Sequence, residues 1–267
     1  MGTGGTIQDL TEPFYQPAGD EVALFEAAWH GRLPVMLKGP TGCGKTRFVE
    51  HMAWRLRRPL VTAAAHEDMT ASDLTGRWLL GPQGTLWQDG PLTRAAREGA
   101  ICYLDEVVEA RQDTVVVLHP LTDTRRMLPL EKCGETVQAH PDFLLVVSYN
   151  PGQGGGAREL KQSTRQRFVA IAFDYPAPGI EAAIVAREEG VAPALAATLV
   201  EVGLATRRLR DAGLAERAST RMLIHAGRLC RGGVGLREAV RSAVVLPITD
   251  DPDMTHALAC AADACLE

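Results

Sequence analysis

The chain has 267 residues, of which 46% are hydrophobic and 23% are charged, a balance typical of a water-soluble globular protein. Its length suits one large domain, or one domain of about 170 to 180 residues followed by a smaller one. The net charge of −5 argues against a protein whose main task is to grip nucleic acid, because neutralising phosphates requires a basic face.

No apolar run approaches the roughly 18 residues of a membrane span. Residues 1–6 lack the basic and apolar regions of a signal peptide, so we expect a cytoplasmic protein that does not insert into a membrane. The six cysteines form no Cys-x-x-Cys pair and mostly have apolar neighbours. We therefore expect free and largely buried thiols.

The first two thirds of the chain alternate strand and helix patterns. Asp20 is positioned to cap a helix over residues 21–30, with a buried stripe of Val22, Leu24, Phe25, Ala28 and Trp29. Apolar runs predict strands at 35–37, 59–63, 99–106, 143–147 and 167–173. Helical patterns fall between them at 47–56, 70–76, 91–98 and 111–121. The alternation predicts an α/β fold with a parallel sheet covered by helices on both faces.

Two segments interrupt this alternation and are predicted to be hairpins. One spans residues 77–90, with Gly81-Pro-Gln-Gly84 as its turn, and the other spans residues 126–140. The first hairpin carries Trp78 and Trp87. Two tryptophans on so short a segment fit either core packing or an exposed contact surface, and periodicity does not decide between them.

Beyond Pro176-Ala-Pro178 the pattern becomes rich in alanine and leucine and contains no strand signal. Helices are predicted at 180–190, 192–211, 218–231, 235–246 and 253–266. We therefore divide the chain into an α/β domain over residues 1–176 and a small all-helical domain over residues 177–267, with the proline-rich joint as a hinge.

A phosphate-binding loop is predicted between the first strand and the helix that follows it, because the spacing is Gly-x-x-x-x-Gly-Lys-Thr. Its residues are Gly39, Pro40, Thr41, Gly42, Cys43, Gly44, Lys45 and Thr46. The glycines allow successive N–H groups to turn inward around a phosphate, and the helix adds its positive end. Lys45 is expected to reach the β- and γ-phosphates, and Thr46 to place its hydroxyl on Mg²⁺.

Two carboxylates, Asp105 and Glu106, end a strand about sixty residues after the loop. Carboxylates at strand ends are often solvated caps, but beside a phosphate loop they suggest hydrolysis. Asp105 would hold Mg²⁺, directly or through water, and Glu106 would act as general base toward the attacking water. Asn150 ends another strand and could orient that water; alternatively, Asn150-Pro151 is simply a turn.

Arginines cluster further along the chain, at Arg158, Arg165 and Arg167. A permanently charged guanidinium stabilises charge on a transferring phosphoryl group, whereas the plainer interpretation is a basic solvated surface. Arg221 starts a helix of the second domain, where the positive helix end disfavours a cation. That position suggests that Arg221 also reaches the phosphates.

Taken together, these residues resemble the AAA+ superfamily and, within it, the MoxR branch. Gly39–Thr46, Ile101–Glu106, Asn150, Arg165-Gln-Arg167-Phe168 and Ser219-Thr-Arg221 are similar in order to Walker A, Walker B, sensor 1, arginine finger and sensor 2. The match covers about residues 12–250, and the two hairpins are similar to inserts of that branch. The resemblance implies an ATPase with an AAA+ domain and a helical lid.

Four longer stretches resemble the CbbQ/NorQ/NirQ group: residues 34–50, 67–74, 87–93 and 103–113. This resemblance implies a homo-hexamer with ATP between subunits, so that Arg165 or Arg167 acts on a neighbour's nucleotide. It also implies an adaptor with a von Willebrand factor A domain, CbbO-like, and Rubisco or nitric oxide reductase as the client. His66 departs from the superfamily, which usually has a smaller polar residue there that couples substrate contact to the catalytic glutamate. A histidine could do this in a pH-dependent way, but we interpret His66 as a surface residue.

The leading hypothesis from the sequence is an ATP-hydrolysing remodelling motor that reactivates inhibited Rubisco, with nitric oxide reductase activation as the alternative within the group. A second class is a nucleotide-gated scaffold in which hydrolysis is incidental. A DNA-directed motor is a third, which the acidic composition and the lack of a separate DNA-binding domain weaken.

Overall fold

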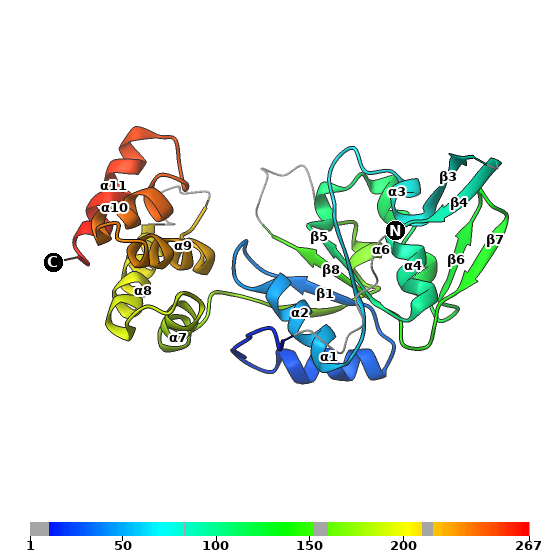
Figure 1. The fold of residues 1–267 in the computed structure, drawn as a ribbon, viewed down its shortest axis with the longest axis horizontal. Coiled ribbons are helices and arrows are strands. Elements are labelled where there is room, and N and C mark those ends of the chain that lie inside the picture. The colour runs from blue at the N-terminus through cyan, green and yellow to red at the C-terminus, as the bar shows by residue number, and fades with distance from the viewer. Residues whose placement is uncertain (1–10, 83, 152–159, 210–215, 267) are drawn as a thin grey trace. The chain divides into compact units, whose positions relative to one another are not determined.

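The computed structural model describes residues 11–82, 84–151, 160–209 and 216–266. The chain divides into two compact units, and each is described here by itself. The first contains the chain up to Gly39 together with Lys45–Phe173, and the second contains Pro40–Gly44 together with Asp174–Glu267. We call them the sheet unit and the helical unit (Figure 1).

The sheet unit is built on five parallel strands in the order β2-β5-β8-β1-β9 (Figure 1). Their bounds are β1 Val35–Lys38, β2 Leu60–Ala64, β5 Ile101–Asp105, β8 Leu144–Tyr149 and β9 Val169–Ala172. The parallel α/β fold predicted from the sequence is confirmed. Parallel strands end at a common edge, so the residues that follow β1, β5 and β8 lie along that edge.

Helices cover the two faces of the sheet, and strand alternation supplies each face with apolar side chains. On one face, α1 Glu21–His30 and α2 Lys45–Arg55 place Phe25, Phe48 and Met52 in a core with Ile101 and Tyr103. On the other face, α4 Pro91–Glu98 and α5 Gln112–Val116 pack against the intervening strand residues Cys102, Leu104, Leu145 and Val147. The bounds predicted for α1 and α4 are confirmed.

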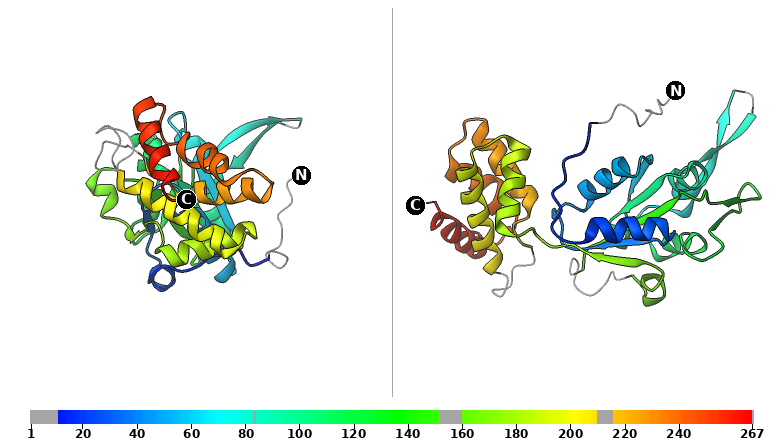
Figure 2. Two further views of the ribbon diagram at one scale, coloured as in Figure 1. Left: turned by 90° about the vertical axis from the view of Figure 1, so that its left-hand side faces the viewer. Right: turned by 90° about the horizontal axis from the view of Figure 1, so that it is seen from below.

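Both predicted hairpins are present. They consist of β3 Gly76–Gly81 with β4 Gly84–Asp89, and β6 Met127–Leu130 with β7 Glu135–Gln138. The β3–β4 hairpin projects from the sheet unit (Figure 2). Trp78 and Trp87 face each other across it, with ring centroids 5.5 Å apart. Trp87 packs against the core, as the first alternative requires, whereas Trp78 is half-exposed and donates to the Lys132 carbonyl at 3.0 Å.

Three local expectations differ from the structure. Asp20 precedes α1, but its side chain makes no capping hydrogen bond, and Leu24 of the expected buried stripe is 48% exposed. The helix expected over residues 111–121 is shorter and broken, because α5 ends at Val116 and only the 3₁₀ turn η3 His119–Leu121 follows. A run of β-branched residues at 115–117 and a proline at 120 disfavour a longer helix.

The short α3 Ala71–Thr75 does form, with a capping box between Thr70 and Asp73.

The helical unit contains no strand in the part of it that the structure describes. Its elements are α7 Pro178–Glu189, α8 Pro193–Arg208, α9 Thr220–Arg231, α10 Leu236–Val240, the π-helical turn η5 Arg241–Val245, and α11 Pro252–Asp263. They enclose a separate apolar core that includes Val185, Leu199, Leu223, Val244 and Leu258.

None of the described helices is both long enough and apolar enough to cross a membrane.

All six cysteines are free thiols. Cys43 and Cys102 are buried, but Cys260 is exposed and Cys133, Cys230 and Cys265 are half-exposed, so the expectation of largely buried thiols is wrong for most of them.

Candidate functional site

The predicted phosphate loop connects the end of β1 to the start of α2. A side chain at Gly39 would collide with the backbone carbonyl of Phe173, so close approach of the chain requires glycine there. Gly42 and Gly44 have φ angles of 70° and 102°, which L side chains rarely adopt. The glycines of the motif are therefore required by the backbone path of the loop.

Lys45 and Thr46 open α2, at the positive end of the helix. Lys45 is 9% exposed, and its Nζ donates to the Gly39 carbonyl oxygen at 2.8 Å. The ammonium group thus lies beside the backbone of Gly39, the first residue of the motif. Thr46 has its hydroxyl 3.4 Å from Asp105 Oδ2, so the two predicted metal ligands lie side by side.

Asp105 is the centre of a hydrogen-bond network at the end of β5. Its Oδ1 accepts from the Tyr103 hydroxyl at 2.7 Å and from the Ser148 hydroxyl at 2.5 Å. Its Oδ2 faces Thr46. One carboxylate oxygen is therefore fixed by two hydroxyl donors, while the other is directed toward the start of α2.

Ser148 links Asp105 to Glu106. The Ser148 hydroxyl donates to Asp105 and also accepts the backbone N–H of Glu106 at 2.7 Å. Glu106 has a φ of 54°, in the left-handed region that a non-glycine residue occupies only at a cost. Its side chain is exposed, and the 3₁₀ turn η2 Val107–Glu109 follows directly. The hydrogen bond that the Glu106 N–H donates to the Ser148 hydroxyl stabilises the backbone turn that presents the Glu106 carboxylate.

Tyr103 and Ser148 were not predicted from the sequence, although it contains a signal for both. Alternate strand residues share a face, so Tyr103 lies on the same side of β5 as Asp105. The same alternation places Ser148 and Asn150 on one side of β8 and its extension. Burial in the apolar core, together with the charge of Asp105, raises the pKa of the Tyr103 hydroxyl, which therefore stays a donor.

The remaining predicted residues lie as follows. Asn150 is half-buried and follows the end of β8, the strand beside β5. Arg165 ends the short helix α6 Gln162–Arg165, and Arg167 follows it; both are exposed. Arg221 is exposed in the first turn of α9, in the helical unit. Arg158 lies outside the described residues, and His66 is exposed, as expected.

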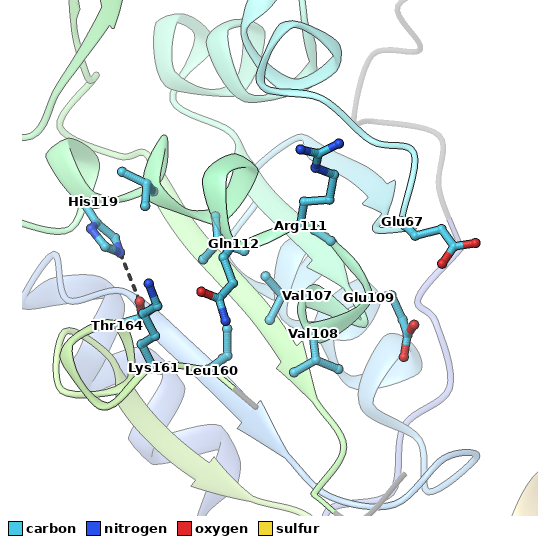
Figure 3. Close-up of a pocket in the computed structure, with 13 residues that line it drawn as sticks. Glu67, Val107, Val108, Glu109, Arg111, Gln112, His119, Leu160, Lys161 and Thr164 are labelled. Carbon is cyan, nitrogen blue, oxygen red and sulfur yellow. Dashed lines mark hydrogen bonds between the residues drawn. The ribbon is translucent and has the colours of Figure 1, made fainter. Parts of the chain in front are cut away.

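A pocket of about 220 Å³ lies between the segment after Glu106 and helix α6 (Figure 3). Val107, Val108 and Leu160 contribute apolar walls. At one side, His119 Nε2 lies 3.1 Å from the hydroxyl of the buried Thr164, the residue before Arg165 (Figure 3). Burial and the charge of Arg167 lower the pKa of His119. The turn η3 thus anchors the short helix that ends at the exposed Arg165.

Comparison with known proteins identifies the family. The model of the AAA domain, dynein-related subfamily, matches residues 34–168, and that of the CbbQ/NirQ/NorQ C-terminal domain matches residues 181–265. The chain is 61% identical over 252 residues to the protein CbbQ of Hydrogenophilus thermoluteolus, covering 94% of each chain. The chain belongs to the CbbQ/NirQ/NorQ family of AAA+ ATPases. The resemblance noted in the sequence is confirmed.

A second relative of this family has a different name. The denitrification regulatory protein NirQ of Pseudomonas aeruginosa is 59% identical over 252 residues, covering 94% of this chain and 96% of NirQ. Identities of 61% and 59% are too close to favour similarity to CbbQ over similarity to NirQ. Among solved structures, a mutant of RuvB from Thermotoga maritima matches with a TM-score of 0.55 at 16% identity, over 90% of this chain and 66% of RuvB, and it supports the fold alone.

The residues of the site fit a nucleotide with Mg²⁺, the groups usual in AAA+ ATPases. The Thr46 hydroxyl and Asp105 Oδ2 are two neighbouring oxygen atoms of the kind that Mg²⁺ prefers, and Mg²⁺ commonly takes its other ligands from water and substrate phosphates. Among the described residues, no group of three or more His, Cys, Asp or Glu side chains could hold a metal by itself.

Proposed function

We propose that this protein is an ATP-hydrolysing remodelling motor that works with a von Willebrand factor A-domain adaptor to reactivate inhibited Rubisco. The observation that carries the hydrolytic part is the continuous array from Thr46 through Asp105 and Ser148 to Glu106. We assign residues 1–176 to nucleotide binding and residues 177–267 to a helical lid, and we infer that the protein acts in the cytoplasm.

ATP would be bound by the backbone of residues 39–46, with Lys45 reaching the β- and γ-phosphates. Thr46 and Asp105 would hold Mg²⁺, Asp105 directly or through water, and the ion would neutralise phosphate charge. Because Tyr103 and Ser148 already occupy one oxygen of Asp105, its other oxygen keeps the orientation toward Thr46. The array would thus have its metal ligands arranged before nucleotide binds.

Glu106 would take a proton from the water that attacks the γ-phosphate, and Asn150 would orient that water. Arg165 or Arg167 would stabilise charge on the phosphoryl group of a neighbouring subunit in a homo-hexamer. Arg221 would do so from the lid. The exposure of all three arginines agrees with this proposal, because a residue that acts outside its own domain must be accessible.

The choice of Rubisco rests on similarity to CbbQ, and the alternative rests on similarity to NirQ. In the alternative, the same motor would serve the activation of nitric oxide reductase with a related adaptor. The two clients can be tested side by side. The purified chain and its co-expressed adaptor are mixed with ATP and Rubisco blocked by a sugar-phosphate inhibitor, and carboxylation is followed over time.

We expect recovery of carboxylation that requires the chain, the adaptor and ATP together. In the parallel arm, nitric oxide reductase activity is measured in cells with and without the gene for this chain. Recovery of the reductase alone would replace the Rubisco proposal with its alternative. If neither client responds, both client assignments are wrong, although the chain could still hydrolyse ATP.

A nucleotide-gated scaffold is a different class of function, in which binding suffices. The same reactivation assay is repeated with a non-hydrolysable ATP analogue. The motor proposal expects no recovery above the rate without nucleotide, because work on the client requires turnover. Full recovery with the analogue would support the scaffold and contradict the motor.

A further inference from the structure

A fully buried carboxylate in the helical unit is not explained by the proposed roles. Glu181, in the first turn of α7, has no solvent exposure. It accepts from both terminal nitrogens of Arg207, at 2.8 and 2.7 Å, and from the Thr220 hydroxyl at 2.6 Å. A buried charge is costly unless it is paired and hydrogen-bonded. Arg207 and Thr220 together meet both requirements for the Glu181 carboxylate.

Arg207 extends the same network to the segment before α9. Its Nε donates to the Ala218 carbonyl at 2.8 Å, and its guanidinium lies 4.1 Å from the centre of the Tyr175 ring. The fork of Arg207 therefore holds Glu181 on one side and the backbone of Ala218 on the other. An ammonium group could not make this combination of contacts, because it lacks the planar fork.

These contacts converge on the start of α9. The Ala218 carbonyl is bound by Arg207, the Ser219 hydroxyl caps the helix by accepting from Met222 N at 3.3 Å, and the Thr220 hydroxyl binds Glu181. All three residues are buried. The next residue, Arg221, is exposed and makes no hydrogen bond or ion pair with the residues that the structure describes. Among the described residues, Arg221 is thus an unpaired cation that directly follows the three residues holding the start of α9 in place.

The other ends of the same two helices are also joined. Glu189, at the end of α7, is fully buried and accepts from Arg228 of α9 at 2.7 Å. Glu181 and Glu189 are eight residues apart, as are Thr220 and Arg228, a span of about 12 Å along either helix. Two contacts at matched spacing oppose both sliding and rotation of α9 against α7.

We propose that Thr220 is a positioning residue for Arg221, with Glu181 and Arg207 as its support. This rests on the proposed function, since it requires Arg221 to act on bound ATP. The Thr220 hydroxyl is an additional donor to a carboxylate that Arg207 already pairs. Removing the hydroxyl leaves the ion pair in place and releases the link that fixes the first turn of α9.

The test compares Thr220→Val, which keeps the shape but loses the hydroxyl, with Thr220→Ser, which keeps the hydroxyl. Both the ATP turnover of the assembled protein and its melting temperature are measured for each variant. We expect Thr220→Val to lower kcat about five- to tenfold and Thr220→Ser to retain most of it. Thr198→Val is the matched control, because within the described part of the chain the Thr198 hydroxyl bonds to its own helix alone, at Ala194 O.

A double-mutant cycle separates positioning from general stability. In the Arg221→Ala background, Thr220→Val should cause no further loss, since the residue it orients is gone. An equal loss in both backgrounds, or an equal loss for Val and Ser, would overturn the proposal. If Arg221→Ala itself turns over ATP at the normal rate, the assignment of Arg221 in the proposed function is wrong instead.

Arg207→Lys provides a second approach should Thr220→Val fail to fold. It keeps the positive charge beside Glu181 but loses the planar fork and the bond to Ala218. We expect a comparable fall in kcat that again disappears in the Arg221→Ala background. A fall that persists in that background would contradict positioning through α9.

Discussion

The two units hold their central carboxylates in different ways. In the sheet unit, Asp105 is half-buried at a strand end, and its hydrogen-bond partners are the neutral hydroxyls of Tyr103, Ser148 and Thr46. In the helical unit, Glu181 is fully buried, and its charge is neutralised by Arg207. A carboxylate bound by neutral hydroxyls keeps a net negative charge that attracts a cation. The charge of a carboxylate paired with a guanidinium is already neutralised.

This difference separates a carboxylate suited to catalysis from one that stabilises the packing of helices. Asp105 has one oxygen directed at Thr46, as a metal ligand in a phosphate-loop enzyme requires. Glu181 joins α7, α8 and the start of α9. Substitutions of the first carboxylate and its partners should therefore change catalysis more than stability. Substitution of Glu181 itself should do the reverse, because it leaves Arg207 buried without its partner.

The largest effect on stability is expected for Glu181→Leu. The substitution leaves Arg207 buried without its partner, and breaking a buried pair in this way costs about 3–5 kcal/mol. Urea unfolding followed by circular dichroism measures the loss. Glu201→Leu removes an exposed glutamate of α8 and should change stability by less than about 0.5 kcal/mol. Similar values for the two variants would remove the contrast between the units.

Ser148→Ala tests the opposite side of the comparison. It removes the hydroxyl that binds both Asp105 and the backbone N–H of Glu106, so we expect about a tenfold loss of ATP turnover. The melting temperature should change much less than in Glu181→Leu. Ser163→Ala, at an exposed serine of α6, is the matched control. Normal turnover by Ser148→Ala would show that the link between Asp105 and Glu106 is dispensable.

The smallest effect concerns His119, which bonds to Thr164 beside the exposed arginines. Burial and the charge of Arg167 lower its pKa, so the folded protein binds fewer protons than the unfolded chain as pH falls through about 6.5. Its contribution to stability is therefore present at neutral pH and is lost on acidification.

His119→Gln cannot titrate at this position and should lose less melting temperature than the wild type between about pH 7.5 and 5.5. His225→Gln, at an exposed histidine of α9, controls for removal of a histidine. Identical acid sensitivity in the wild type and His119→Gln would show that this group has no part in it.

The sequence predicted the sheet unit well because its signals are local. The bounds of α1 and α4 follow from apolar periodicity and from Pro91 at a helix start. The phosphate loop and the strand ending in Asp105 have fixed spacing and position. The helix expected through residue 121 stopped at Val116, because weak helix formers follow where the periodic pattern suggested continuation.

The buried network of the helical unit could not be predicted in the same way. Glu181 meets Arg207 and Thr220 at sequence separations of 26 and 39 residues, and an amphipathic pattern does not specify which polar side chains turn inward. In sequence, Glu181 and Glu189 look like ordinary solvated helix residues. Tyr103 and Ser148 lie between these cases, since strand alternation could have indicated them once Asp105 was chosen.

We propose that Glu106, held beside Asp105 by Ser148, acts as the general base of ATP hydrolysis. Single-turnover hydrolysis and equilibrium ATP binding are measured for Glu106→Gln, with Glu131→Gln at an exposed hairpin position as control. We expect a fall in the hydrolysis rate of about 10²-fold or more, with ATP binding retained. Hydrolysis by Glu106→Gln at the wild-type rate would contradict it.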